Sequence, residues 1–190
     1  MNTGVKADLI FAQVVGGQID EYIRTEVLFY PVGSVAGVAM PQLTIGTWLE
    51  TAWRLRARSQ ALSAEQQASY EAARAGVQRV RSLWPAPYQH KAQREFKSRL
   101  DSWSWYLDEV LGKEGPLSRQ GAGYATQVHV LLKLRLLRDD VSQLSGELAR
   151  LDYCDRRLRT RFVPGPFVWE PELESAAPSD TMWFLYGQLV

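Results

Sequence analysis

The chain has 190 residues, of which 46% are hydrophobic and 23% are charged, and its formal net charge is +1. This length suffices for one domain with a sizeable core, and the near-neutral charge argues against a general polyelectrolyte role while leaving room for a local basic face. Cys154 is the single cysteine, so an internal disulfide is excluded. With no signal peptide in the first residues, we expect a cytoplasmic protein.

The first predicted helix spans residues 5–25, where apolar side chains recur with the helical period. Gly16 and Gly17 interrupt it, and each costs about 1 kcal/mol relative to alanine in a helix interior. Either the helix kinks at this pair, or another backbone comes close to it.

Residues 27–49 carry no charged side chain. Pro31 and Pro41 argue against a membrane-spanning helix, and the glycines lack the lysine of a phosphate-binding loop. We expect a short hairpin-like or irregular insertion at 27–43. Its strands would be 27–30 and 35–40, its turn Gly33-Ser34, and the whole connector would be buried against helices.

Three more helices are predicted before residue 112. Thr44 or Thr47 caps the second, which ends near Ser59, and Ser63-Ala-Glu-Gln66 has the form of a capping box for the third. The third ends at Trp84-Pro85, and the fourth runs from about Tyr88 to Gly112. On that fourth helix Trp105 lies nearly opposite the core residue Trp103, so it faces a second covered side, solvent or a partner. Residues 112–123 are expected to form a loop.

The segment 74–99 holds seven basic residues and one acid, Glu95, on both sides of the Trp84–Pro87 turn. Basic residues interleaved with aromatic ones are typical of single-strand nucleic-acid binding. A solvated helix face, or a docking site for the acidic C-terminal residues, are the alternatives. The candidate nucleic-acid contacts are Arg74, Arg81, Lys91, Arg94 and Lys97.

Residues 124–162 contain the strongest periodic pattern of the chain, with leucines and valines at alternating four- and three-residue steps. One unbroken helix would be about 58 Å long, whereas a compact domain of this size has a radius of gyration of about 16 Å. Either the helix breaks near Ser145-Gly146, or the protein is elongated, or the far end pairs with another copy.

The last residues, 163–190, combine four prolines and four acids with a cluster of large apolar side chains. Such side chains are too apolar to remain in water, so we expect an arm that packs on the bundle or grasps a partner. The predicted domains are therefore a helical bundle at 1–162 and a C-terminal arm at 163–190.

The sequence offers no catalytic motif. His90 and His129 lie on different predicted helices without metal-ligand spacing, and Cys154 fits a small buried thiol. We therefore name no catalytic residue, no metal ligand and no cofactor, and we lean against an enzyme.

The predicted fold is all-α, an antiparallel bundle of four to five helices. The function we favour is a non-catalytic interaction protein, either a homo-oligomer or a subunit of a larger assembly, because the chain has a long heptad pattern and 7 tryptophans. A nucleic-acid-associated module, or a small-ligand binder or enzyme with a pocket lined by 28–46, are the alternatives. The predicted interface residues are Leu144, Leu148, Leu151, Leu158, Trp169, Trp183 and Phe184.

Overall fold

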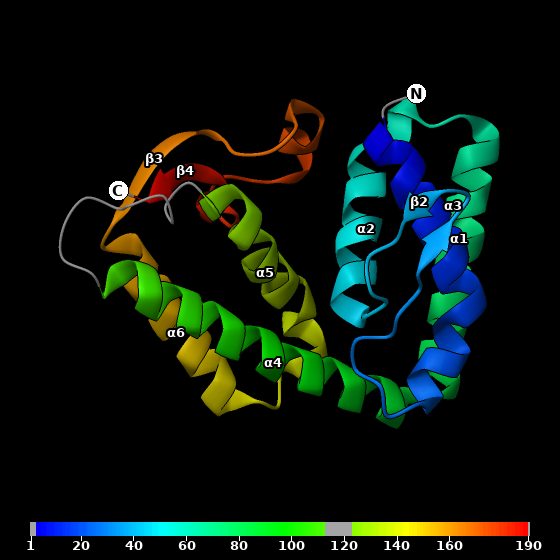
Figure 1. Cartoon of the computed structure of the whole chain (residues 1–190), viewed down its shortest axis with the longest axis horizontal. Coiled ribbons are helices and arrows are strands. Elements are labelled where there is room, and N and C mark those ends of the chain that lie inside the picture. The colour runs from blue at the N-terminus through cyan, green and yellow to red at the C-terminus, as the bar shows by residue number, and fades with distance from the viewer. Residues whose placement is uncertain (1–2, 113–122, 190) are drawn as a thin grey trace. The chain divides into compact units, whose positions relative to one another are not determined.

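The computed structural model describes residues 3–112 and 123–189, and it confirms a mainly helical chain with an irregular insertion and an aromatic C-terminal arm (Figure 1). The chain divides into two compact units, unit 1 (Met1–Glu95) and unit 2 (Phe96–Val190). The boundary falls inside helix α4 (Pro85–Leu111). Among the residues described, none of the helices has the length and apolar character that a membrane span requires.

In unit 1, helix α1 (Thr3–Arg24) packs against α2 (Ile45–Ala57) and α3 (Ala64–Leu83). Gly16 lies where α1 meets α3, and a methyl group added there would stand 3.2 Å from the Cα atom of Ala73. Of the two explanations for the glycine pair, close approach of another backbone is therefore confirmed at Gly16.

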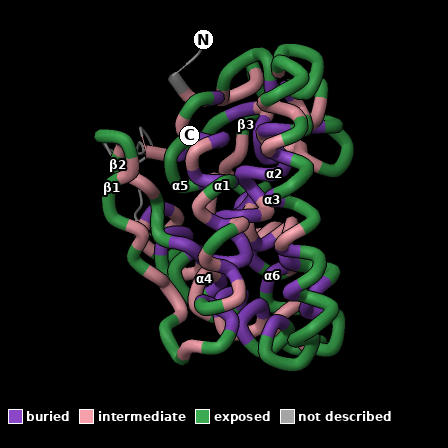
Figure 2. The backbone as a smooth tube through the Cα atoms, turned by 90° about the vertical axis from the view of Figure 1, so that its right-hand side faces the viewer, coloured by how far each residue is buried: buried purple, intermediate pink, exposed green. Residues whose placement is uncertain are grey.

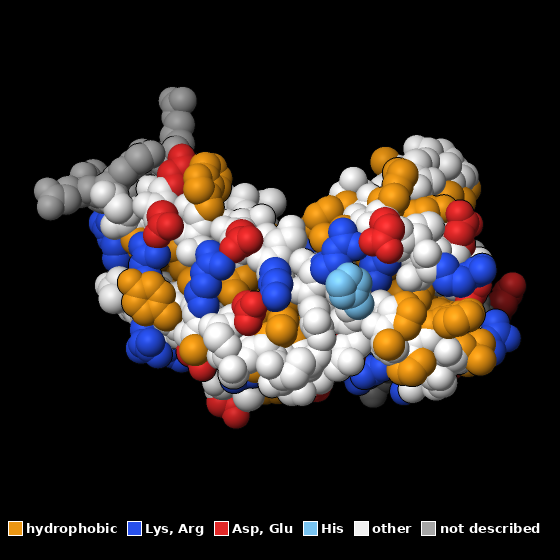
Figure 3. Space-filling view, turned by 90° about the horizontal axis from the view of Figure 1, so that it is seen from below, with side chains coloured by type: hydrophobic (Ala, Val, Ile, Leu, Met, Phe, Trp, Pro, Cys, Tyr) orange, Lys and Arg blue, Asp and Glu red, His pale blue; other side chains and the backbone are white. Residues whose placement is uncertain are grey.

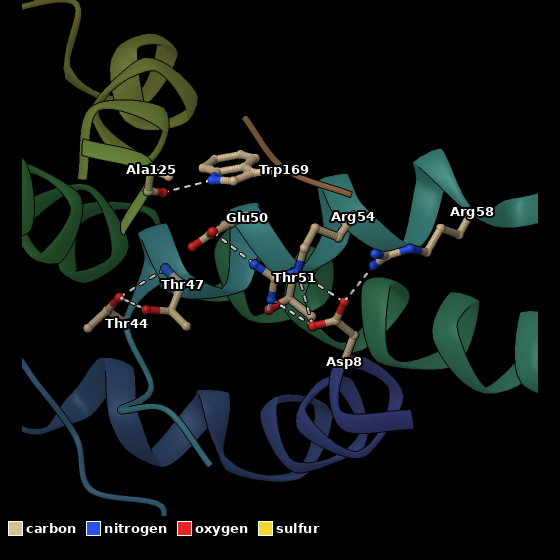
Figure 4. Close-up of polar contacts among 9 residues, drawn as sticks. All are labelled: Asp8, Thr44, Thr47, Glu50, Thr51, Arg54, Arg58, Ala125 and Trp169. Carbon is tan, nitrogen blue, oxygen red and sulfur yellow. Dashed lines mark hydrogen bonds and ion pairs between the residues drawn. The ribbon is translucent and has the colours of Figure 1, made fainter. Parts of the chain in front are cut away.

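A buried ion network joins α1 to α2 (Figure 4). Arg54 on α2 donates to both carboxylate oxygens of Asp8 on α1, with Nη2 to Oδ1 at 2.6 Å, and Arg58 reaches the same carboxylate at 3.4 Å. Arg54 also pairs with Glu50 one turn earlier, at 2.8 Å. The arginines near the end of α2 thus hold two helices together, in addition to favouring the helix C-terminus.

The insertion forms a hairpin, but at a different register from the predicted one. Strands β1 (Ser34–Val35) and β2 (Val38–Ala39) pair around a turn at Ala36-Gly37, and not at Gly33-Ser34. Ala36 and Gly37 have φ angles of +50° and +76°, as a tight two-residue hairpin turn requires at both central positions.

The prediction that this connector is buried is wrong for residues 27–42, all of which are exposed or half-buried. Its turns and prolines leave backbone polar groups without partners in a ladder, and such groups need water. Burial begins at Leu43, whose backbone pairs with that of Tyr30, and continues into α2.

The predicted helix starts are confirmed for α2 and α3. Thr44 caps α2 by accepting from the amide of Thr47 (Figure 4), and Ser63 and Gln66 form the reciprocal capping box of α3. Helix α4 begins at Pro85, three residues before the predicted start, because proline is well tolerated in the first turn of a helix.

A buried carboxylate from α4 completes the start of α2. Glu95 is fully enclosed, and its two oxygens accept hydrogen bonds from the Thr44 hydroxyl at 2.6 Å and the Gly46 amide at 2.8 Å. A negative charge at a helix N-terminus satisfies free amides and complements the helix dipole. Glu95, the single acid of the basic segment, is therefore a structural residue.

In unit 2 the predicted long helix is broken. Helix α5 (Tyr124–Leu137) is followed by the 3-10 turn η3 (Arg138–Val141), and α6 (Ser145–Arg159) begins after it. Asp139 and Asp140 oppose the dipole at the C-terminal end of α5, whereas Glu147 suits the first turn of α6. Of the three alternatives for this segment, a break near Ser145 is the one observed, and most of the heptad leucines become core residues.

Helices α4 and α6 lie side by side and parallel, linked by a ladder of ion pairs (Figure 1). The pairs run in order along both helices, so that Lys97 bonds to Glu147, Asp101 to Arg150, and Asp108 to Arg157. Cys154 lies between the last two pairs and is buried, which confirms the expectation of a structural thiol. Burial raises the pKa of the Cys154 thiol and so keeps it unreactive.

The C-terminal arm packs within unit 2. Strands β3 (Phe162–Phe167) and β4 (Tyr186–Leu189) pair, with the 3-10 turns η4 (Pro171–Ala176) and η5 (Trp183–Leu185) between them. The indole of Trp169 stacks on His129 and donates to the Ala125 carbonyl on α5 at 2.8 Å (Figure 4). Buried residues recur along the helices between exposed ones, and most residues of the connecting segments are exposed or half-buried (Figure 2).

Candidate functional site

The candidate site is a pocket in unit 2 on the side of α4, which we call the α4 pocket. It has a volume of about 650 Å³ and is bounded by α4 and the beginning of α5. Residues four apart on a helix share a face, so the α4 residues line it in two rows. The lining residues are Asp101, Ser102, Trp105, Tyr106, Glu109, Val110, Gly123 and Gln127.

Trp105 is the most exposed large hydrophobic side chain among the residues that the structure describes, with 68% of its surface accessible. Its neighbour Trp103 is completely buried on the opposite face of the same helix. The core of unit 2 therefore has no need of Trp105. Of the three surroundings allowed by the sequence, solvent or a partner fits best, because residues 3–112 and 123–189 do not cover Trp105.

Tyr106 lines the α4 pocket and is almost completely buried, with its hydroxyl group unpaired among the described residues. Burial raises the pKa of Tyr106 to about 12. The hydroxyl thus keeps its proton at neutral pH, and the oxygen itself is enclosed and does not face the open pocket.

The charged residues of the pocket are both acidic. Asp101 is exposed and bonds to Arg150 at 2.5 Å, and Glu109 lies two helical turns further along α4. The described lining contains no lysine, arginine or histidine. Within residues 3–112 and 123–189, no cluster of His, Cys, Asp and Glu is arranged to hold a metal ion.

The structure places the predicted interface residues in three different environments. Leu151, Leu158 and Phe184 are fully enclosed in the core of unit 2 and offer a partner no surface. Leu144 and Leu148 are half-buried at the start of α6.

The two remaining predicted interface residues are half-buried tryptophans of the arm. Trp169 is engaged with α5, as described above. Trp183 packs edge-on against Phe162 and is covered by the guanidinium of Arg159, 3.7 Å from the ring centroid. Both tryptophans therefore bury much of their surface in contacts within unit 2.

The predicted nucleic-acid contacts are mostly engaged with acids or buried. Arg74 pairs with Glu71 and Arg94 with Glu26, each at 3.2 Å, and Lys97 belongs to the α4–α6 ladder in unit 2. Arg81 is exposed and lies over the ring of Tyr88. On the face drawn in Figure 3, basic and acidic side chains are interspersed.

Lys91 is only 2% exposed. Its ammonium group donates to the Val27 carbonyl and to the Thr25 hydroxyl, and it lies 4.2 Å from the ring centroid of Tyr22. Burial, with a smaller contribution from nearby Arg94, lowers the pKa of Lys91 to about 8. This side chain ties α4 to the end of α1 and is inaccessible to a nucleic acid.

The sequence contained only part of the signal for the α4 pocket. The opposed positions of Trp103 and Trp105 indicated that one tryptophan needs a second environment, and Trp105 is the exposed one. The four-residue spacing of Asp101, Trp105 and Glu109 could have identified the row that lines the pocket. The contribution of Gly123 and Gln127 depends on how α5 returns along α4, which no local pattern encodes.

In comparisons with known proteins, no family model, no curated protein and no solved structure matches the chain.

Proposed function

We propose that this chain is a non-catalytic interaction protein that binds a protein partner, another copy or a different subunit, through the α4 pocket. The observation that carries the proposal is the exposed indole of Trp105 beside a concave surface. Tryptophan is the residue most enriched at energetic hot spots of protein interfaces, particularly where it enters a pocket or borders one. An exposed tryptophan that its own core does not use is a feature expected of such a surface.

The lining of the α4 pocket favours a protein over a nucleic acid as the partner. The described lining holds no lysine or arginine that would attract phosphate groups, whereas an aromatic centre with a polar rim is common in protein interfaces. The proposal places the interface on α4 and not on the buried leucines of α6. Of the four leucines predicted to lie at an interface, only Leu144 and Leu148 are partly accessible.

The test is site-specific photo-crosslinking in the cells that make the protein. A photoreactive phenylalanine replaces Trp105 in one variant and Tyr153 in a matched control, because Tyr153 is also exposed, at 53%, but belongs to α6. We expect position 105 to give one discrete adduct whose mass identifies a second copy or one other protein, and position 153 to give none.

The identified partner is then titrated against the purified chain. Trp105→Ala should weaken binding about 30-fold, the effect of losing a hot-spot residue, and Tyr153→Ala should leave it unchanged. If position 105 gives no more adduct than position 153, or if Trp105→Ala binds as well as the natural chain, the proposal is wrong.

A further inference from the structure

We propose that the contact between Trp169 and His129 is a pH-sensitive attachment of the C-terminal arm to α5, stronger when the imidazole of His129 carries a proton. Neither residue lines the α4 pocket, so this inference is independent of the proposed function.

The first support is the geometry of the contact. The imidazole of His129 and the indole of Trp169 are stacked, with their ring centroids 4.1 Å apart and their planes inclined by 19°. The indole N–H donates to the Ala125 carbonyl, one turn earlier on α5, and this bond of 2.8 Å holds the ring in place (Figure 4). A positive charge over the face of an indole, within about 6 Å of its centroid, is attracted by the π electrons. A protonated imidazole therefore binds Trp169 more strongly than a neutral one.

The second support is the identity and exposure of the residue that meets the indole. Histidine is the side chain that ordinarily changes its charge between pH 5 and 8. His129 is half-buried, so its ring remains in contact with water and can exchange its proton there. The charge over the indole of Trp169 therefore changes within the range of pH that cells experience.

The third support is the placement of the charged groups around the contact. The arm continues from Trp169 into three exposed acids, and residues 163–190 contain no basic residue. Lys133, one turn after His129, is on the same helix, so its repulsion of an imidazolium is present whether or not the arm is docked. The carboxylates are on the arm, so only docking brings them toward the imidazolium. The three acids are Glu170, Glu172 and Glu174.

The segment that this contact attaches is 168–177. At its start the amide of Val168 donates to the Leu185 carbonyl at 2.9 Å, and at its end the Ala177 carbonyl accepts from the Tyr186 hydroxyl at 2.6 Å. Trp169 lies between these two bonds. The segment can thus open locally while β3 and β4 stay paired, and a stronger Trp169 contact makes such opening rarer.

The test is amide hydrogen exchange of segment 168–177 in the full chain at pH 5.5 and 7.5. Each rate is divided by the rate of an unstructured chain at the same pH, which gives the fraction of time that the segment is open. We expect this fraction to fall about threefold at pH 5.5, the effect of a cation on an exposed aromatic face.

Two variants separate the proton from the shape of the side chain. His129→Gln is neutral at both pH values, and His129→Phe keeps an aromatic ring for the stack without a titrating group. The open fraction should not depend on pH in either variant. His90→Gln is the matched control, because His90 is the other histidine and is exposed on α4, and it should behave as the natural chain does.

An equal open fraction at both pH values in the natural chain would overturn the inference, because the proton would then have no effect on the attachment. A pH dependence that persists in both His129 variants would also overturn it, since another group would then be responsible.

Discussion

Gly16 and Gly17 are neighbours in α1 with opposite surroundings. A methyl group on Gly17 meets nothing within 4 Å, whereas one on Gly16 would press on the backbone of α3. Gly17→Ala should therefore raise the free energy of unfolding by about 1 kcal/mol, the difference in helix propensity. Gly16→Ala should lower it, because crowding against a backbone outweighs that gain. Denaturant unfolding of the two variants measures both, and equal effects would contradict the close approach of α3.

Lys91 makes the stability of the fold depend on pH in a defined window. Its pKa is about 8 in the folded chain, against an ordinary value of 10.5. Between these values the unfolded chain binds a proton that the folded chain does not, so the free energy of unfolding rises with pH. We expect the natural chain to gain up to about 3 kcal/mol relative to Lys91→Met between pH 8 and 10.5.

This difference is measured by urea unfolding of both proteins across the window, which cancels the titration of the tyrosines. A constant difference between the two proteins would show that Lys91 has its ordinary pKa.

The burial of Lys91 could not be predicted from the sequence, where it is one of seven basic residues in the segment 74–99. Its environment comes from Tyr22, Thr25 and Val27, which are more than 60 residues away along the chain.

At the scale of single elements, local signals predicted the helix starts well. Ser63 and Gln66 are three residues apart, so their reciprocal hydrogen bonds follow from the sequence alone. Ser63→Ala should lower the free energy of unfolding by about 1 kcal/mol, the usual effect of losing an N-cap. Ser59→Ala, in the preceding 3-10 turn η1 (Ser59–Ala61), is the control and should change it little in the same thermal unfolding series.

The break between α5 and α6 was harder to predict because the hydrophobic period continues across it. Leu137, Val141 and Leu151 keep core positions on both sides of the turn. The spacing of apolar residues therefore predicts which side chains are buried. It does not predict whether they all belong to one continuous helix. The relevant signal is charge: Asp139 and Asp140 follow directly after α5, where negative charge opposes the helix dipole.

At the scale of the whole chain, α4 is common to both units. Tyr88 and Ala92 belong to the core of unit 1, and Leu100 and Leu107 to that of unit 2. The sequence shows no composition change or linker at this boundary, because one regular helix crosses it. The boundary between the two units depends only on which residues the two parts of α4 pack against, so it cannot be predicted from local sequence patterns.

A shared helix should couple the unfolding of the two units. Melting α4 removes core residues from both, so we expect a single calorimetric transition whose van't Hoff and calorimetric enthalpies agree. Two resolved transitions would contradict this expectation and would show that each unit keeps its own part of α4 when the other unfolds.

Glu95 also determines when, during synthesis of the chain, the start of α2 can be completed. The first turn of α2 depends on a carboxylate made 49 residues after Gly46. A ribosome releases the chain from its N-terminus, so α1, α2 and α3 all emerge before the group that completes α2. Until α4 has left the exit tunnel, the start of the nascent α2 therefore has its Thr44 cap but lacks the carboxylate that accepts from the Gly46 amide.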